Sequence, residues 1–320
     1  MTPPDAERPG IERVLSQIGD IRVVEKLSRL SGPDLTTLLL DVASRRASGI
    51  SAADVLARSR TDRFSRPNVV PWRELRRVED AFIAAVPSGW RWVALSPLVP
   101  FGAHARLGNV TQDWVVATVR ANEVAADPTV GLALEAADAR RDTATRRSGP
   151  PQRLAGIQRI VRAQLYASPE AFTHFEIFGL VTAGRGQPGN RFEIQTILEH
   201  LDIYVTALSG IAQNIAVLLS VADTPAGKRL FDAVTERSSS RVELNVTPDP
   251  ERLPNQRYYR TACFKVRATM FDEDVEIADG GFTDWSERLL NDRHERLLIS
   301  GAGLDRPARL MGARDAATDR

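Results

Sequence analysis

Cysteine is almost absent from the sequence: Cys263 is the single one among 320 residues. One thiol excludes an internal disulfide, so we expect a fold that depends on its apolar core, in a reducing, cytoplasmic setting. We interpret Cys263 as a small buried residue of a strand. The four histidines show no metal-ligand spacing with this cysteine, so we expect no tightly bound metal.

An excess of charge of one sign is also missing. The sequence has 42 Lys and Arg against 41 Asp and Glu, a formal net charge of +1. Nucleic-acid-binding proteins usually carry a basic excess because they neutralise phosphates, so the composition gives no support to such a partner. No apolar run approaches the roughly 20 residues that span a bilayer, and residues 1–5 do not resemble a signal peptide, so we expect no membrane association.

The hydrophobic content of 43% is ordinary for a soluble globular protein, and the chain divides into four parts. We expect a disordered start at 1–10, a helical annex at 11–66, a main domain at 67–312 and a polar tail at 313–320. Within the annex, helices are predicted near 11–30, 33–47 and 52–60 from their cap and breaker residues.

The main domain mixes predicted helices with hairpin-like strands, without a steady βαβ rhythm. Strands are expected near 90–95, 114–120, 155–166 and 173–183, with a surface linker at 142–152. This pattern favours an α+β fold around an antiparallel sheet.

Two segments in the first half of this domain combine a regular element with distinctive side chains. Residues 73–97 predict an amphipathic helix and a strand that ends at Pro97, a pattern that is common when taken alone. Residues 119–123, Val-Arg-Ala-Asn-Glu, are followed by Thr129. Their Arg120 and Glu123 are also consistent with an exposed ion pair at a strand end.

A predicted strand–loop–strand carries an arginine suited to phosphate. Residues 160–164 read Ile-Val-Arg-Ala-Gln, and ten residues later residues 174–179 read His-Phe-Glu-Ile-Phe-Gly. The planar, permanently charged guanidinium of Arg162 is suited to bidentate binding of phosphate oxygens.

Glycines and a further arginine follow near the end of the chain. Residues 257–261 read Arg-Tyr-Tyr-Arg-Thr, 278–284 read Ala-Asp-Gly-Gly-Phe-Thr-Asp, and 300–306 read Ser-Gly-Ala-Gly-Leu-Asp-Arg. Glycine permits a close approach of backbone to a bound group, although a lone Gly-x-Gly is equally consistent with a tight turn.

In this order, the four segments resemble the signature segments of class II aminoacyl-tRNA synthetases of the histidyl type, over roughly residues 71–311. The resemblance implies a class II synthetase-type antiparallel β-sheet flanked by helices, with an N-terminal helical annex. It also implies a homodimer through residues 72–97, because the corresponding family segment builds the dimer interface.

The resemblance further implies a site for ATP with Mg²⁺ beside a site for a small amino or carboxylic acid. Arg162 and Arg306 would be the catalytic arginines that grip the phosphates of ATP, and Glu123 would hold the amino group of the acid. The other implied nucleotide-binding residues are Gln164, Phe175, Gly301 and Gly303. The other implied acid-binding residues are Arg120, Tyr258, Tyr259, Gly280, Gly281 and Asp284.

Several residues depart from the family pattern. Gln164 replaces a glutamate, Ile177 replaces a glutamine, and Phe282 replaces an arginine. Pro254 stands where the family has an arginine that assists histidine activation, with Arg252 nearby but out of register. These exchanges argue against histidine as the substrate. The sequence ends just after the last segment, without the family's anticodon-binding domain, so we do not expect tRNA as a partner.

Three interpretations remain open. The protein is an ATP-dependent adenylating enzyme, or a regulatory subunit that resembles that of ATP phosphoribosyltransferase and binds an amino acid and a partner enzyme. Alternatively, it is a dimeric structural protein that keeps only the fold.

Overall fold

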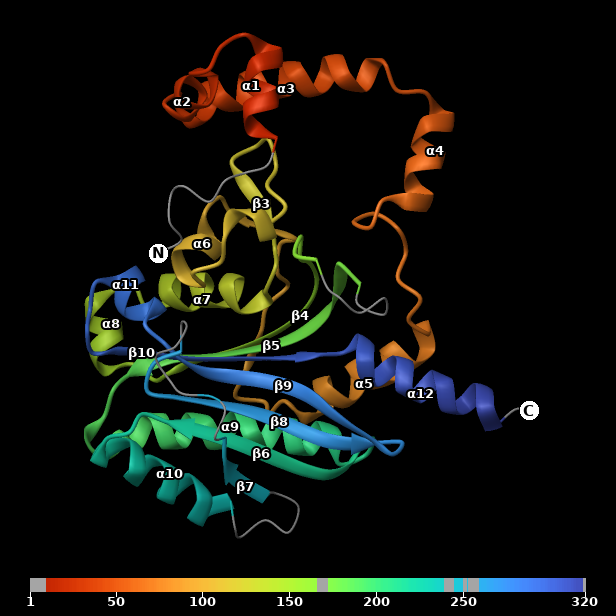
Figure 1. Cartoon of the computed structure of the whole chain (residues 1–320). Helices are drawn as coiled ribbons and strands as arrows, with labels where there is room; N and C mark the ends of the chain where they lie inside the picture. The colour runs from red at the N-terminus through yellow and green to blue at the C-terminus, as the bar shows by residue number, and fades with distance from the viewer. Residues whose placement is uncertain (1–9, 166–171, 239–244, 250–251, 253–258, 319–320) are drawn as a thin grey trace.

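The structure, a computed structural model, describes residues 10–165, 172–238, 245–249, 252 and 259–318, with the backbone alone at 145 and from 315 onward. An eight-stranded sheet with the order β1-β4-β5-β10-β9-β8-β6-β7 organises this part of the chain (Figure 1). The strands are β1 (Arg91–Trp92), β4 (Gln152–Val161), β5 (His174–Arg185), β6 (Gln213–Val221), β7 (Asn245–Pro248), β8 (Ala262–Met270), β9 (Glu273–Thr283) and β10 (Glu295–Gly303). All neighbours are antiparallel except the two outer pairs, β1–β4 and β6–β7. The predicted α+β class with an antiparallel sheet is confirmed.

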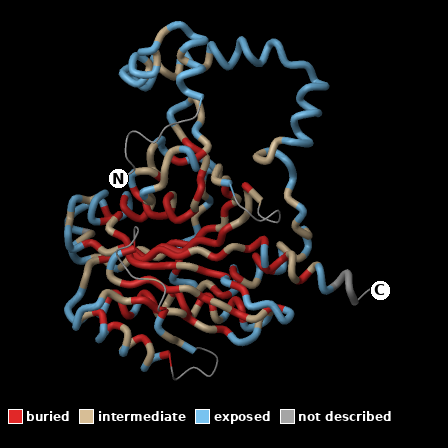
Figure 2. The backbone as a smooth tube through the Cα atoms, viewed as in Figure 1, coloured by how far each residue is buried: buried red, intermediate tan, exposed pale blue. Residues whose placement is uncertain are grey.

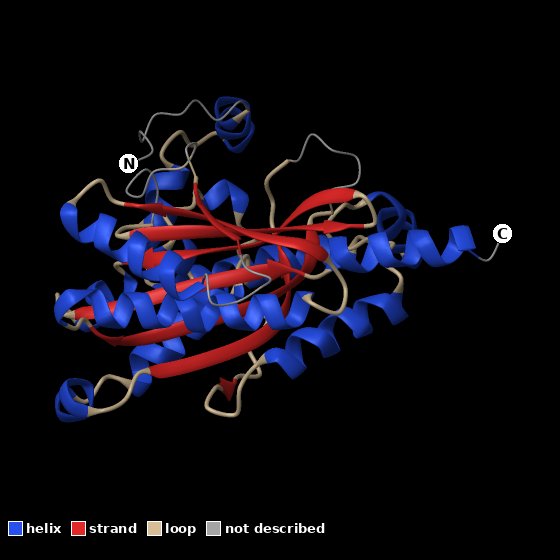
Figure 3. Cartoon of the chain, turned by 90° about the horizontal axis from the view of Figure 1, so that it is seen from below, coloured by secondary structure: helices blue, strands red, loops and turns tan. Residues whose placement is uncertain are grey.

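Helices cover both faces of this sheet. One face packs on α5 (Trp72–Ala85), α9 (Arg191–Leu208), α10 (Pro225–Ser238) and α12 (Asp305–Thr318). The other packs on α7 (Pro128–Ala139) and α11 (Trp285–Leu290). Viewed from below, the strands form one twisted sheet, and α12 projects beyond it toward the C-terminus (Figure 3).

Alternation along β5 separates the two cores. On β5, Phe178 and Leu180 belong to the α9 side, whereas Ile177 and Val181 belong to the α7 side. Successive strand side chains point to opposite faces, so a buried strand supplies both cores at once. The core residues are therefore concentrated along the sheet (Figure 2).

The hairpin between β8 and β9 turns without glycine. Phe271 and Asp272 occupy the two turn positions, with φ of 50° and 67°. Positive φ at both positions is the geometry of the two-residue turn that matches strand twist, and aspartate tolerates it better than most residues. This turn sets the β8–β9 register.

The N-terminal annex is a chain of four helices that stands off the core as an arm (Figure 1). They are α1 (Ile11–Ile18), α2 (Val23–Ser28), α3 (Gly32–Ser48) and α4 (Ala52–Thr61). None of their residues is buried (Figure 2). The predicted helix at 11–30 is two helices, because Gly19 adopts φ 74° and ends α1.

Some predicted elements differ in the structure. The strand expected at 114–120 is a 3₁₀ turn, η1 (Gln112–Trp114), followed by one isolated bridge between Ala117 and Glu123. The chain turns back at once there, because the side chain of Thr118 bonds to the Asn122 side chain and the Arg120 amide. The expected linker contains α8 (Thr143–Ser148), and α12 continues to Thr318 through the expected polar tail.

A second, two-stranded sheet lies above α7 and was not predicted. It pairs β2 (Leu98–Pro100) with β3 (Asn122–Val124), and α6 (Ala103–Leu107) follows β2. The short strands and intervening proline explain why periodicity gave no signal. The residues before 10 lie outside the described chain, and none of the described helices is both long and apolar enough to cross a bilayer.

Candidate functional site

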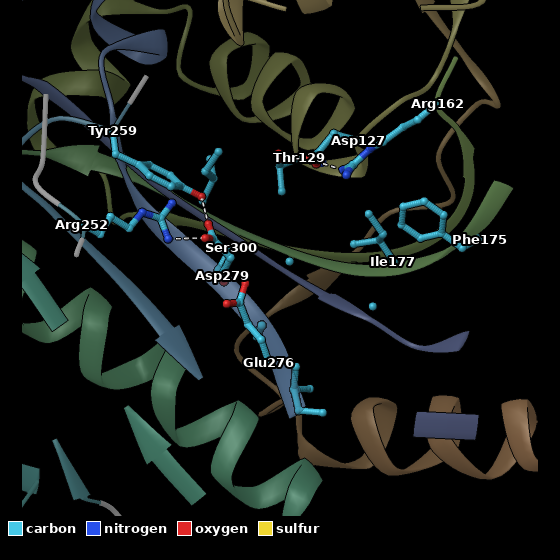
Figure 4. Close-up of a pocket in the computed structure, with 15 residues that line it drawn as sticks. Asp127, Thr129, Arg162, Phe175, Ile177, Arg252, Tyr259, Glu276, Asp279 and Ser300 are labelled. Atoms are coloured by element: carbon cyan, nitrogen blue, oxygen red, sulfur yellow. Dashed lines mark hydrogen bonds and ion pairs between the residues drawn. The ribbon is translucent and has the colours of Figure 1, made fainter. Parts of the chain in front are cut away.

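A cavity of about 320 Å³ opens on the α7 side of the sheet (Figure 4). Its walls come from the start of α7, the ends of the β4–β5 hairpin, and the middle of β9 and β10. Its lining residues include Asp127, Thr129, Arg162, Phe175, Ile177, Arg252, Tyr259, Glu276, Asp279, Gly301 and Gly303.

Arg162 stands at one end of the cavity, just after β4. Its Nε donates to the carbonyl oxygen of Ala126 at 2.9 Å, and its guanidinium lies over the Phe175 ring at 5.2 Å. Its Nη2 is 3.6 Å from a carboxylate oxygen of Asp127. The guanidinium is thus oriented by one hydrogen bond and a ring, while its ion pair is loose enough to exchange for a ligand.

Asp127 and Thr129 face Arg162 from the N-terminus of α7. Asp127 caps this helix by accepting hydrogen bonds from the Thr129 amide at 2.9 Å and hydroxyl at 2.6 Å. Gly179 of β5 permits this approach, because a Cβ there would lie 3.0 Å from Pro128. The N-terminus of α7 therefore packs closely on the sheet, and this places Asp127 at the cavity.

A second arginine–carboxylate group forms the other end. Arg252 pairs with Asp279 and lies over the Tyr259 ring at 4.9 Å, and the Tyr259 hydroxyl donates to Asp279 at 2.5 Å (Figure 4). Burial lowers the pKa of Arg252, but its hydrogen bond and charge pairing with Asp279 outweigh burial and raise the pKa overall. The Arg252 guanidinium is therefore charged and held against Asp279.

The glycines play different parts. A Cβ at Gly303 would meet no atom within 4 Å, so the space beside its backbone is empty. A Cβ at Gly280 would lie 2.6 Å from the Phe264 ring, and one at Gly281 would lie 2.6 Å from the Tyr259 ring. These two glycines make room for neighbouring side chains, and Gly281 in particular makes room for Tyr259.

Of the residues proposed from sequence, the structure brings Arg162, Phe175, Tyr259, Gly301 and Gly303 together around the cavity. Arg306 is exposed at the start of α12, outside the described cavity lining. Three other residues named from sequence are outside the described cavity lining: Arg120 is exposed, the Gln164 carbonyl oxygen accepts from Arg63, and Asp284 pairs with Arg260. Tyr258 lies outside the described chain.

Glu123 lies off the cavity and is fully buried. Its carboxylate accepts hydrogen bonds from the Gly102 amide, from the amide and Nδ1 of His104, and from Gln112. Burial raises its pKa, but these hydrogen bonds prevail and lower the pKa below its usual value. The Nε2 of His104 accepts from the Ala126 amide at 2.9 Å, so Glu123 acts on the site only by supporting the backbone beside Asp127.

Sequence reasoning missed Asp127, Arg252 and Asp279 as cavity residues. The signal for Asp127 was present: Asp127-Pro128-Thr129 has the acid-x-Thr spacing of the family segment without any insertion. Arg252 is two residues out of register with the family arginine in the sequence, yet its long side chain reaches the cavity.

Several solved structures share this architecture, while no protein-family model and no curated protein sequence matches the chain. An ATP phosphoribosyltransferase regulatory subunit/histidyl-tRNA synthetase from Bacillus halodurans aligns with TM-score 0.58 and 12% identity, over 77% of this chain and 82% of that one. The apo histidyl-tRNA synthetase of S. aureus gives 0.56 and 14%, over 75% and 65%. A histidine–tRNA ligase subunit from Alicyclobacillus acidocaldarius gives 0.54 and 13%, over 76% and 94%.

These likenesses define the class of the fold. The chain has a class II aminoacyl-tRNA synthetase-like core, as its sequence segments predicted, and its cavity lies on the α7 side of the sheet. Identities of 12–14% establish the fold alone, so the activity has to be argued from the site.

Proposed function

We propose that the protein binds ATP with Mg²⁺ and a small amino acid in this cavity and joins them into an aminoacyl-adenylate. The observation that carries the proposal is the facing pair Arg162 and Asp127, whose charged groups are 3.6 Å apart. Arg162 suits a phosphate and Asp127 suits an ammonium group. In the free protein they neutralise each other, and the two substrates would replace that pairing with two new ones.

The adenine ring would lie near Phe175, and the open backbone at Gly303 leaves room for the nucleotide. Thr129 would add a hydroxyl beside the ammonium group. Arg252 would hold the carboxylate of the amino acid, which keeps it directed at the phosphate. Ile177 contributes an apolar wall where the family has a polar side chain.

Adenylate formation needs no general base, because the attacking carboxylate is already ionised. A carboxylate oxygen bonds to the α-phosphorus, the bond from that phosphorus to the bridging oxygen of the β-phosphate breaks, and pyrophosphate leaves with the electron pair. Arg162 stabilises the charge that builds on the α-phosphate, and the cavity aligns the reactants. Mg²⁺ would enter the site bound to the phosphates of ATP and would neutralise part of their charge.

Amino-acid-dependent ATP–pyrophosphate exchange, measured with pools of the common amino acids, tests this proposal. We expect exchange with one pool, its loss in Arg162→Ala, and a loss of at least tenfold in Asp127→Asn through a raised KM for the amino acid. Absence of exchange with every pool would contradict the enzymatic proposal.

A regulatory role is the second candidate, and the exposed position of Arg306 outside the cavity favours it. With one of the two expected ATP arginines away from the site, the cavity would bind an amino acid and report its presence to a partner enzyme. The expected result is then a melting temperature raised by one amino acid but not by ATP, and no exchange.

We also propose a cytoplasmic homodimer through residues 72–97. Trp72, Ile83 and Trp92 in this segment are 69%, 40% and 41% exposed, and a symmetric interface through 72–97 would cover this apolar surface. The mass of the protein in solution tests this assembly.

A further inference from the structure

Residues 62–68 join the N-terminal arm to the core, and we call this segment the strap. It lies against the loop end of the β4–β5 hairpin. The guanidinium of Arg63 donates to the carbonyl oxygens of Ala163 at 2.5 Å and Gln164 at 3.2 Å, directly after β4. The Thr173 hydroxyl, directly before β5, donates to the carbonyl oxygen of Arg63. One residue of the strap therefore binds both sides of the hairpin.

The rest of the strap continues this attachment. His174 donates through Nε2 to the carbonyl oxygen of Arg66 at 2.8 Å. The side-chain amide of Asn68 donates to the carbonyl oxygen of His174 at 3.2 Å and to Asp305 at 2.5 Å. Asp305 is the first residue of α12, so the strap binds the hairpin and the start of this helix together.

The residues held by the strap are chain neighbours of the cavity lining. Arg162 precedes Ala163, and Phe175 follows His174; both side chains line the cavity. The Arg162 amide donates to the Thr173 carbonyl at 2.7 Å, which closes the hairpin at the level where Arg63 binds. The direction of the Arg162 side chain therefore depends on a backbone held from outside by the strap.

We propose that Arg63 is a positioning residue for Arg162, and that the strap sets the geometry of the phosphate-binding end of the cavity. This rests on the proposed function, because it assigns Arg162 to ATP. Arginine suits the task because its rigid fork spans two successive carbonyl oxygens, which a single ammonium group cannot do equally well. Since no residue from 11 to 61 is buried, these bonds also fasten the exposed arm to the nucleotide side of the site.

The test compares Arg63→Ala and Arg63→Lys in the full chain with Arg60→Ala, which removes an exposed arginine of α4. Hydrogen exchange reports the amides of Arg162 and Ala163, which donate to Thr173 and Trp114. Titration with ATP and Mg²⁺ reports affinity. We expect Arg63→Ala to speed exchange and to weaken ATP binding about tenfold, the lysine variant to fall between, and Arg60→Ala to match the parent in both.

Each outcome is decisive. Unchanged exchange in Arg63→Ala would show that the strap does not hold the hairpin, and faster exchange with unaltered ATP affinity would show that it does not position Arg162. Either result overturns the inference while leaving the proposed function intact. If the parent binds no ATP, the assignment of Arg162 to ATP fails with the proposed function, and the exchange data alone then decide whether the strap holds the hairpin.

Discussion

Replacing Glu176 by glutamine tests a cluster of carboxylates on the opposite face of the sheet from the proposed site. Glu176 of β5 lies close to Glu79 of α5 and Asp305 of α12, and Arg159 is 3.4 Å from Glu176 and 3.5 Å from Asp305. Burial, the hydrogen bond with Glu79 and the nearby negative charges raise the pKa of Glu176 from 4.5 to about 7. Arg159 lies near Glu176 and Asp305, and Arg76 pairs with Glu79, but these cations do not compensate for three crowded acids.

The direction of the pH effect follows from this raised pKa. Below pH 4.5 the carboxyl group is protonated in both the folded and the unfolded chain, so its full contribution to stability is present. Between pH 4.5 and about 7 only the unfolded chain loses its proton, and stability falls. A tenfold change in acidity corresponds to about 1.4 kcal/mol, so the full loss is roughly 3 kcal/mol, and we expect about 2 kcal/mol after partial exposure to water.

Urea unfolding at pH 5 and pH 8 measures this loss. Glutamine mimics the protonated acid, so Glu176→Gln should unfold at about the parent's urea concentration at pH 5 and above it at pH 8. Glu287→Gln, which changes an exposed acid of α11, supplies the matched control. A difference between parent and Glu176→Gln that is the same at both pH values would refute the reasoning, because Glu176 would then be ionised throughout and paired with Arg159.

Two further substitutions test packing at the site and in the core. Gly303→Val places a side chain in empty space, so we expect ATP titration to show lost binding while the melting temperature changes little. Gly281→Ala should instead lower the melting temperature, because its new Cβ would lie 2.6 Å from the Tyr259 ring. In the native protein, Nε and Nη2 of the buried Arg140 donate to the two carboxylate oxygens of Glu295 at 2.7 and 3.0 Å. Glu295→Gln removes this charged partner, so urea unfolding should show a loss of about 3–5 kcal/mol in the free energy of unfolding. The double variant Arg140→Met with Glu295→Leu should recover part of that loss.

The sequence predicted the fold where periodicity and breakers act locally. The helix at 72–85 and the two strands of the β4–β5 hairpin follow from their apolar spacing. The β2–β3 sheet was not predicted because three-residue strands carry no periodic signal. The strand expected near 90–95 is only the two-residue β1 in the structure. Such elements depend on tertiary hydrogen bonds, which a local pattern does not contain.

The site was predicted less well, for a different reason. Arg162, Phe175 and Gly303 lie in segments that keep the family's spacing, and they line the cavity. Glu123 matches the family segment in residue type but not in spacing, and it is buried away from the cavity. In three dimensions Asp127, four residues later, reaches the cavity beside Arg162, because α7 begins at the next residue and Gly179 lets the helix approach the sheet. A one-dimensional match measures distance along the chain, while the position of an acid in a cavity depends on where its helix starts.

The two arginines of the cavity carry a consequence for what it can bind. Each is already paired with an acid, Arg162 with Asp127 and Arg252 with Asp279. A ligand with charge of one sign would satisfy one member of a pair and leave the other unpaired in a partly desolvated site, which is costly. Substrates that together bring an ammonium group and anionic oxygens can pair with both members at once: the ammonium group pairs with the aspartate, and the anionic oxygens pair with the arginine. The pairing thus favours a zwitterionic amino acid together with a phosphate over either a simple acid or a simple amine.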